Sequence, residues 1–139
     1  MPKRLFVDTS YILALFNTSD EFHEKAKELK SLTSRPNTLV TTEAILLEIG
    51  NSLAKQNIRQ ECATIIHGFY RSENIEVMPI TTALIKEGLE FFEKRRDKDW
   101  GLIDCISFVV MHKLGIRQAL AADDHFTQAG FKALLLDTP

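Results

Sequence analysis

A three-layer α/β/α sandwich with a mainly parallel central sheet is the fold that this sequence predicts. Short β-like runs alternate with longer amphipathic helical patterns, as in proteins whose parallel strands are covered by helices on both faces. The pattern at residues 102–114 is apolar on nearly every side, as expected of a helix buried against such a sheet. The chain has 139 residues and shows no linker or repeat, so we expect a single domain over residues 1–139.

The first half of the chain is expected to open with a strand at residues 5–7, followed directly by a helix. Thr18 and Glu21 have the spacing of a capping box, which predicts that a second helix opens there. A turn at residues 35–37 contains a proline and ends this helical region. The pattern then predicts a strand at 38–41 and helices at about 42–55 and 60–71.

The second half begins with a β-like segment at residues 75–80, whose strand is expected to end near Met78 because Pro79 cannot donate to a ladder. Charged amphipathic sequence predicts a helix over about 82–95. The apolar helix at 102–114 is stopped by Gly115. Two last β-like runs, 118–122 and 131–136, flank a short helix that ends at Gly130.

Composition restricts the classes of function. The formal net charge is −2, which is not the basic balance of a protein that coats nucleic acid. A protein that concentrates carboxylates around metal ions can have this balance and still bind a polyanion. The chain has no apolar run of about 20 residues and no signal-type start, so we expect a cytoplasmic protein without a membrane segment. Cys62 and Cys105 lie in apolar helical patterns and are interpreted as reduced core residues.

Four carboxylates occupy positions where an ordinary surface acid is not preferred. Asp8 and Asp123 each follow a predicted strand, and ligands of open α/β sheets bind at the carboxyl ends of strands. Glu48 lies between Leu47 and Ile49 in a predicted helix. Asp104 lies in the apolar helix, on the same face as Ser107, and a buried charge there requires a partner.

A divalent cation explains such a set, since Mg²⁺ and Mn²⁺ prefer oxygen ligands. Four carboxylates suit two ions about 3.5–4 Å apart, or one ion and a general base. Each residue also has a simpler interpretation. Asp8 and Asp123 could cap the helices that follow them, Glu48 could be a partly exposed helix residue, and the helix dipole could favour Asp104.

At these residues the sequence resembles the PIN-domain ribonucleases, and in particular the VapC-like toxins of bacterial toxin–antitoxin pairs. Four segments carry the resemblance, in order and over nearly the whole chain: residues 6–15 (FVDTSYILAL), 41–51 (TTEAILLEIGN), 99–108 (DWGLIDCISF) and 123–131 (DDHFTQAGF). They place Asp8, Glu48, Asp104 and Asp123 at the family's acidic positions. The chain departs from the pattern at Ile103, where Thr is frequent, and at Ala121, where a hydroxyl is common; neither change removes a carboxylate.

The resemblance implies a PIN-like sandwich, a Mg²⁺ or Mn²⁺ cofactor, and endonucleolytic hydrolysis of RNA phosphodiester bonds. It also implies a homodimer and a small antitoxin protein that blocks the acidic pocket. We expect Asp8, Asp104 and Asp123 to be inner metal ligands, and Glu48 to bind a metal through water or to help activate the attacking water. Thr9 and Ser10 are expected to hydrogen-bond a carboxylate, a metal-bound water or a phosphate oxygen. Ser107 is a further candidate for a hydrogen bond to one of the metal ligands.

Weaker candidates lie near the third segment. Asp99 could be an outer ligand or the N-cap of the following helix. The basic residues at 94–98 could hold RNA phosphates or form a solvated helix end. Trp100 could stack on a base, although a core position is more usual for Trp. His125 could approach the site, although a structural role for His125 and Phe126 is favoured.

Other functions fit the residues less well. A phosphate-accepting receiver would have an acidic pair after the first strand and a Lys after a late strand, but Thr9 follows Asp8 and no Lys directly follows Asp123. A haloacid-dehalogenase-type phosphatase would have Asp-x-Asp after the first strand, but here Ser10 stands at the position of the second Asp. A non-catalytic RNA-binding or scaffold domain would be expected to have lost a carboxylate. A DNA nuclease of related chemistry stays an alternative, because metal-assisted phosphodiester cleavage does not itself select the sugar.

Overall fold

Five parallel strands form one sheet, in the order β3-β2-β1-β4-β5, in the computed structural model, which describes residues 1–137. The central strands are β1 and its two neighbours, β2 and β4. In chain order the elements are β1 (Arg4–Val7), α1 (Thr9–Phe16), α2 (His23–Glu28), the 3₁₀ helix η1 (Leu29–Thr33), β2 (Thr38–Thr42), α3 (Glu43–Ser52), α4 (Arg59–Arg71), β3 (Ile75–Met78), α5 (Thr82–Lys94), α6 (Leu102–Leu114), β4 (Gln118–Leu120), α7 (Asp124–Gln128), β5 (Lys132–Ala133) and the 3₁₀ helix η2 (Leu134–Leu136).

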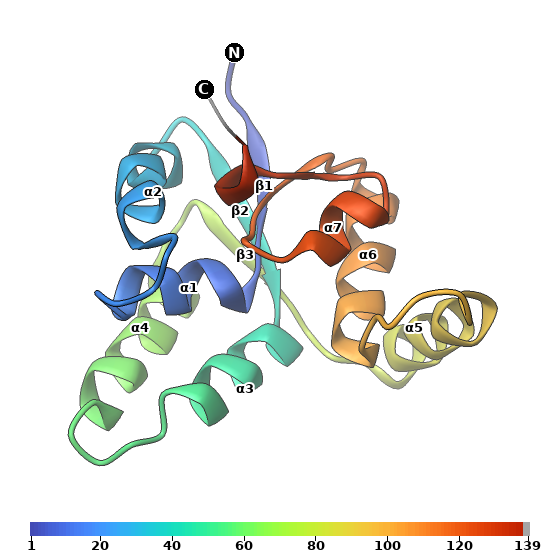
Figure 1. The fold of residues 1–139 in the computed structure, drawn as a ribbon, viewed down its shortest axis with the longest axis horizontal. Helices are drawn as coiled ribbons and strands as arrows, with labels where there is room; N and C mark the ends of the chain where they lie inside the picture. The colour runs from blue at the N-terminus through green and yellow to red at the C-terminus, as the bar shows by residue number, and fades with distance from the viewer. Residues whose placement is uncertain (138–139) are drawn as a thin grey trace.

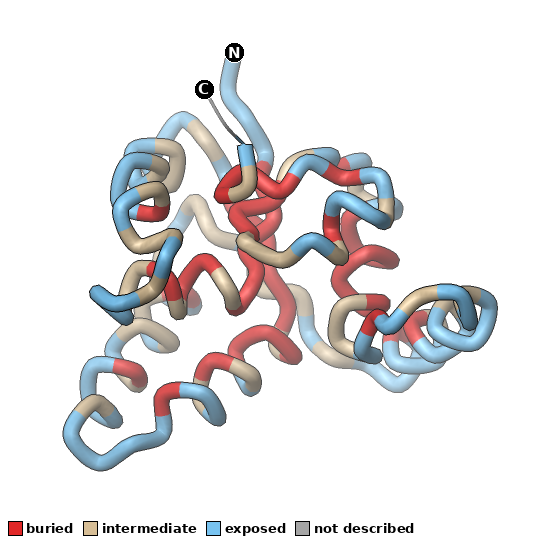
Figure 2. Tube along the Cα trace, viewed as in Figure 1, coloured by how far each residue is buried: buried red, intermediate tan, exposed pale blue. Residues whose placement is uncertain are grey.

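Helices cover both faces of the sheet, which confirms the predicted three-layer sandwich (Figure 1). Helices α1 to α4 lie on one side, and α5, α6 and α7 lie on the other. Figure 2 shows that burial is concentrated in the central strands β1, β2 and β4 and in α6, whereas the outer sides of α2, α4 and α5 are exposed. The predicted mainly parallel sheet is fully parallel among the described residues.

The first strand lies at the centre because its side chains are apolar on both faces. Leu5, Phe6 and Val7 are each exposed by 1% or less, as expected of a strand covered from both sides. Phe6 is in register with Val40 of β2 and with Ala119 of β4. The Thr41 hydroxyl donates to the Val7 carbonyl oxygen at 2.8 Å, which ties β2 to the end of β1.

The apolar helix predicted at residues 102–114 is α6, with the same bounds. It ends at Gly115, which has a φ of 68°, the left-handed conformation that favours glycine. Helix α5 packs closely on it: a Cβ built on Gly88 would lie 2.5 Å from Ile106 Cγ1. Cys62 and Cys105 are buried free thiols, as expected from their apolar surroundings.

Two predicted boundaries were wrong. No helix opens at Thr18, since the Asn17 and Asp20 side chains accept the backbone N–H groups of Ser19 and Phe22 and form turns instead, so α2 begins at His23. The β-like run at 131–136 forms a strand only at Lys132–Ala133, because the Leu135 N–H bonds to the Ala121 carbonyl and the chain turns into η2. Among residues 1–137, none of the helices combines the length and the apolarity that crossing a bilayer requires.

Candidate active site

Asp8 lies at the carboxyl end of β1 and is 5% exposed. Its Oδ2 accepts hydrogen bonds from the Ser10 backbone N–H at 3.1 Å and from the Ser10 hydroxyl at 2.5 Å, so it caps α1. Ser10 Oγ in turn accepts the Ala122 N–H at 2.9 Å, just after β4. The two neighbouring strands are therefore joined at their carboxyl ends through the residue that holds Asp8.

Glu48 of α3 contacts the first turn of α1, which also holds Asp8. Its Oε1 accepts a hydrogen bond from the Thr9 hydroxyl at 2.5 Å, although the two residues are 39 apart in the sequence. Thr9 and Ser10, the first residues of α1, thus each hold one carboxylate. Helix α3 can present Glu48 in this way because Ile45 and Ile49, on the neighbouring face, are fully buried and fix the helix against the core.

Asp104 lies in the first turn of α6, where its Oδ2 accepts the Gly101 N–H at 3.1 Å. That bond supports the start of α6, and an acidic residue there also favours the helix dipole. Asp123 caps α7 by accepting the His125 N–H at 2.9 Å. The capping interpretations of Asp8 and Asp123 therefore hold, and both caps lie beside the other carboxylates.

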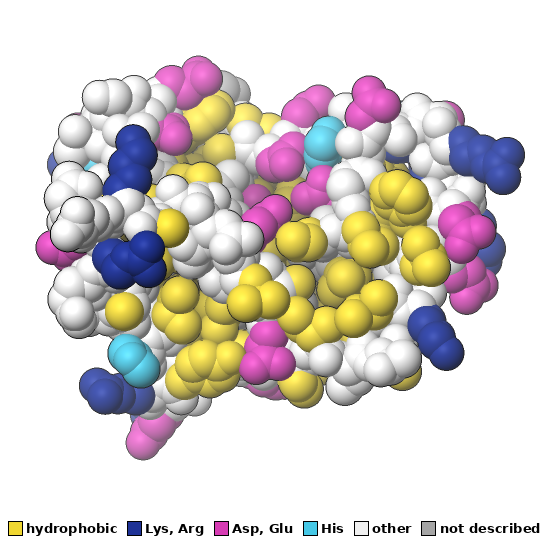
Figure 3. Space-filling view, turned by 90° about the horizontal axis from the view of Figure 1, so that it is seen from below, with side chains coloured by type: hydrophobic (Ala, Val, Ile, Leu, Met, Phe, Trp, Pro, Cys, Tyr) yellow, Lys and Arg dark blue, Asp and Glu magenta, His cyan; other side chains and the backbone are white. Residues whose placement is uncertain are grey.

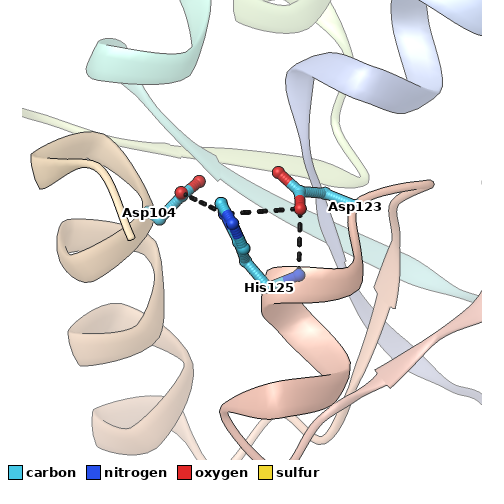
Figure 4. Close-up of side chains that lie close together, drawn as sticks. All are labelled: Asp104, Asp123 and His125. Atoms are coloured by element: carbon cyan, nitrogen blue, oxygen red, sulfur yellow. Dashed lines mark hydrogen bonds and ion pairs between the residues drawn. The ribbon is translucent and has the colours of Figure 1, made fainter. Parts of the chain in front are cut away.

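His125, for which the sequence favoured a structural role, lies beside two of these carboxylates. Its Nδ1 lies 2.9 Å from Asp104 Oδ2 and 3.4 Å from Asp123 Oδ1 (Figure 4). The only signal in the sequence was its position two residues after Asp123, in the first turn of a short helix. We call Asp8, Glu48, Asp104 and Asp123 the acidic cluster; Figure 3 shows acidic side chains and a histidine close together on the face seen from below.

Burial has the largest effect on the pKa of Asp8. Burial raises the pKa of Asp8 from its ordinary 3.8 to about 7; the Ser10 hydrogen bonds oppose this, and the charges of Asp104 and Glu48 add to it. Burial lowers the pKa of His125, but the hydrogen bond with Asp104 and the charges of Asp123 and Asp104 outweigh burial, so its pKa is raised. Within residues 1–137, no Lys or Arg forms an ion pair with any of the four carboxylates.

A divalent cation fits this arrangement. The charges of Glu48 and Asp104 act on the buried Asp8, and His125 joins Asp104 to Asp123. The described chain supplies no lysine or arginine to balance these carboxylates. One ligand atom from each of Asp104, Asp123 and His125 lies within 4.8 Å of the other two, a separation that a single ion can bridge. The donor set suits an ion such as Mg²⁺ or Mn²⁺.

Several weaker candidates lie elsewhere. Asp99 is exposed and does not cap α6, because Gly101 occupies the N-cap position. The Ser107 hydroxyl is buried and donates to the Ile103 carbonyl inside α6 at 3.1 Å, rather than to a carboxylate. Trp100 is 3% exposed and donates from Nε1 to Gln128 Oε1 at 3.0 Å, so its ring is a core element and not a base platform.

The predicted basic segment is only partly available to a substrate. Lys94 pairs with Glu90, while Arg95 pairs with Asp97 and covers the Trp100 ring at 4.8 Å. Arg96 and Lys98 form no ion pair among the described residues, and both line a hollow beside the loop that leads into α6. These two cations are the ones that could meet a phosphate.

Comparisons with known proteins agree with the fold. A protein-family model described as the PIN domain matches residues 5–132. The 23S rRNA-specific endonuclease VapC20 of Mycobacterium tuberculosis, in strains CDC 1551 / Oshkosh and ATCC 25618 / H37Rv, is 32% identical over 127 residues, which are 91% of this chain and 95% of the relative. The crystal structure of Mycobacterium tuberculosis VapC20, described as a sarcin–ricin loop cleaving toxin, matches with a TM-score of 0.81 and 30% identity, covering 93% of this chain and 97% of that one.

Proposed function

The chain belongs to the PIN-domain family, and from that premise we propose that it is a divalent-metal-dependent endoribonuclease, the toxin of a toxin–antitoxin pair, acting as one nuclease domain in the cytoplasm. The observation that carries the proposal is the acidic cluster. Asp8 and Asp123 follow β1 and β4, the charges of Glu48 and Asp104 act on Asp8, and no lysine or arginine among the described residues pairs with any of the four. The relatives named above are endonucleases of RNA. We take the sarcin–ricin loop of 23S rRNA as the first substrate to test.

Asp8, Asp104 and Asp123 are proposed to hold Mg²⁺ or Mn²⁺ directly. The bound ion would supply positive charge that lowers the pKa of a water and stabilises charge on the phosphate. In the metal-free protein the pKa of Asp8 is about 7, so ionising its buried carboxyl group is costly. A cation bound beside Asp8 would neutralise the buried negative charge and so favour the ionised form. The Ser10 hydrogen bonds fix the orientation of this carboxylate.

Glu48 is proposed to orient the attacking water. Thr9 holds its Oε1, and no hydrogen bond within residues 1–137 engages its Oε2, which can therefore accept a proton of the water. In the hydrolysis one P–O bond of the RNA backbone breaks, and the elements of water are added to the two ends. Arg96 and Lys98, which line one hollow, are proposed to hold a flanking phosphate.

Protein partners are proposed from the apolar surface. Figure 3 shows hydrophobic side chains gathered on the face that also carries the acidic side chains. Ile85, Leu89 and Phe92 of α5 are exposed by 40–43% and follow helical spacing on one side of the helix. We propose that such surfaces serve a homodimer contact and the contact with a small antitoxin protein; light scattering of the purified protein, with and without a co-purifying small protein, tests both.

The decisive experiment is cleavage of an RNA that contains the sarcin–ricin stem-loop, beside other structured RNAs and single-stranded DNA, with Mg²⁺, Mn²⁺ or EDTA. Asp8→Asn keeps the shape of the site but removes a charge, and we expect cleavage to fall by at least about 10³-fold. Glu21→Gln removes an exposed carboxylate that is not part of the cluster and should cleave like the wild type. Cleavage in EDTA, or undiminished cleavage by Asp8→Asn, would refute the assignment. Cleavage of DNA alone would favour the DNA nuclease. If the protein cleaves none of the substrates, the non-catalytic RNA-binding or scaffold domain is favoured.

A further inference from the structure

One histidine lies inside a site otherwise made of carboxylates. His125 Nδ1 is within 3.4 Å of an oxygen of Asp123 and within 2.9 Å of an oxygen of Asp104, and the side chain is 30% exposed, so an ion can reach it (Figure 4). The histidine comes from α7 and Asp104 from α6, so the three residues form a group between two helices and the end of β4.

The fold holds the imidazole in this place. The backbone N–H of His125 is bound by Asp123, which fixes the first turn of α7. The next residue, Phe126, is fully buried, and its ring meets Phe108 of α6 with centroids 5.0 Å apart. With Phe126 anchored in the core, its neighbour His125 faces the first turn of α6, where Asp104 lies.

The separations match those between ligands of one ion. Two neighbouring oxygen or nitrogen ligands at about 2.1 Å from an octahedral ion lie about 3.0 Å apart, and in a tetrahedral site about 3.4 Å. The Nδ1 of His125 lies 2.9 Å from Asp104 Oδ2 and 3.4 Å from Asp123 Oδ1, and one ligand atom of each residue lies within 4.8 Å of the other two, so one ion can bind all three. By contrast, His23 Nδ1 lies 2.8 Å from the Ala14 carbonyl oxygen, which is a structural contact.

We propose that His125 supplies, through Nδ1, a nitrogen ligand to the ion that Asp104 and Asp123 hold, and that this ligand makes the site prefer Mn²⁺ to Mg²⁺. Mg²⁺ strongly prefers oxygen donors, whereas imidazole binds the later, softer divalent ions more readily. The inference rests on the proposed function only in that both require a metal at the acidic cluster.

The test uses Mn²⁺ alone as the probe, with the full-length protein and no RNA. Pulsed electron paramagnetic resonance of bound Mn²⁺ should show modulation from a directly bound nitrogen, and that modulation should disappear in His125→Ala. Calorimetry should show Mn²⁺ binding weakened about 10-fold or more in His125→Ala, and Mg²⁺ binding changed much less. His67→Ala removes an exposed histidine on α4 and should leave both readings as in the wild type.

His125→Asn separates ligation from positioning. Its amide can still donate a hydrogen bond to Asp104 but is a poor metal ligand, so we expect it to lack the nitrogen signal and to lose the preference for Mn²⁺. A normal Mn²⁺ to Mg²⁺ affinity ratio in His125→Asn, no nitrogen signal in the wild type, or no Mn²⁺ binding at all would overturn the proposal. A wild type that shows the signal but cleaves no RNA would refute the nuclease assignment and leave the ligand assignment standing.

Discussion

Helix α6 carries Asp104 in its first turn and Phe108 one turn later, and the two residues belong to regions built in different ways. The acidic cluster gathers four carboxylates, with Asp8 buried and its pKa raised to about 7. The other region, which we call the aromatic layer, consists of Phe91, Trp100, Phe108, Phe126 and Phe131. Phe108 is at its centre, with the rings of Phe126, Trp100 and Phe131 at 5.0, 5.1 and 5.6 Å.

The difference shows where stability comes from and where it is lost. Every ring contact of the aromatic layer removes apolar surface from water and favours folding. In the acidic cluster, folding desolvates Asp8 and brings like charges together, so without a cation this region opposes folding. The aromatic layer supports α6 and α7, and these helices then hold Asp104 and Asp123 in place against their mutual repulsion, with His125 beside both.

The largest effect is expected in the aromatic layer. Phe108→Ala removes a fully buried ring that cannot be replaced by its neighbours, so the free energy of unfolding should fall by about 3–5 kcal/mol in urea denaturation. Phe92→Ala is the matched control, since Phe92 is 43% exposed and should cost less than about 1 kcal/mol. Equal losses in the two variants would contradict the view that the aromatic layer stabilises the fold.

In the acidic cluster, removing a side-chain charge is expected to raise the free energy of unfolding rather than lower it. In metal-free protein the pKa of Asp8 is about 7 when folded and near 3.8 when unfolded, so the folded state binds its proton more tightly. The cost of ionising Asp8 is absent below about pH 4, grows as pH rises from 4 to 7, and is complete above pH 7. Asp8→Asn should therefore raise the free energy of unfolding at pH 8 by about 2–4 kcal/mol, and by nothing near pH 4.

With added Mn²⁺ the wild type should become more stable than Asp8→Asn, because metal that binds only the folded wild type stabilises it. Urea denaturation with EDTA and with Mn²⁺ measures both effects, and Glu21→Gln, which removes an exposed carboxylate, serves as the control. An Asp8→Asn protein that is less stable than the wild type in EDTA at pH 8 would show that the acidic cluster does not oppose folding.

A smaller effect tests the packing that places α6. Gly88→Ala would put a methyl group 2.5 Å from Ile106 Cγ1 and 3.4 Å from its backbone, so we expect a loss of about 1–2 kcal/mol despite the better helix propensity of Ala. Gly68→Ala in α4 meets nothing within 4 Å and should be neutral or slightly stabilising. Thermal unfolding compares them; a Gly88→Ala protein as stable as Gly68→Ala would mean that α5 and α6 can move apart freely.

The alternation of strands and helices was predicted correctly from the sequence because each element leaves a local periodic pattern. The apolar residues 102–114 defined α6 to the residue, and Gly115 marked its end. Asp8 and Asp123 could be expected near each other because each follows a strand of a parallel sheet, and such strands end at the same edge. Local pattern failed at Thr18, where the side chains of Asn17 and Asp20 competed for backbone N–H groups.

The contacts that complete the site join residues far apart in the chain, and no periodicity records them. Glu48 meets Thr9 across 39 residues, and His125 meets Asp104 across 21. The sequence is compatible with either an exposed or a buried Trp100; in the structure Arg95 and Phe91 cover its ring. Sequence alone determined which residues could carry the chemistry, since residue type and strand ends are local properties. The packing of α6 and α7 determined which of them meet, because that depends on the strand order and on the volume of the aromatic side chains between the helices.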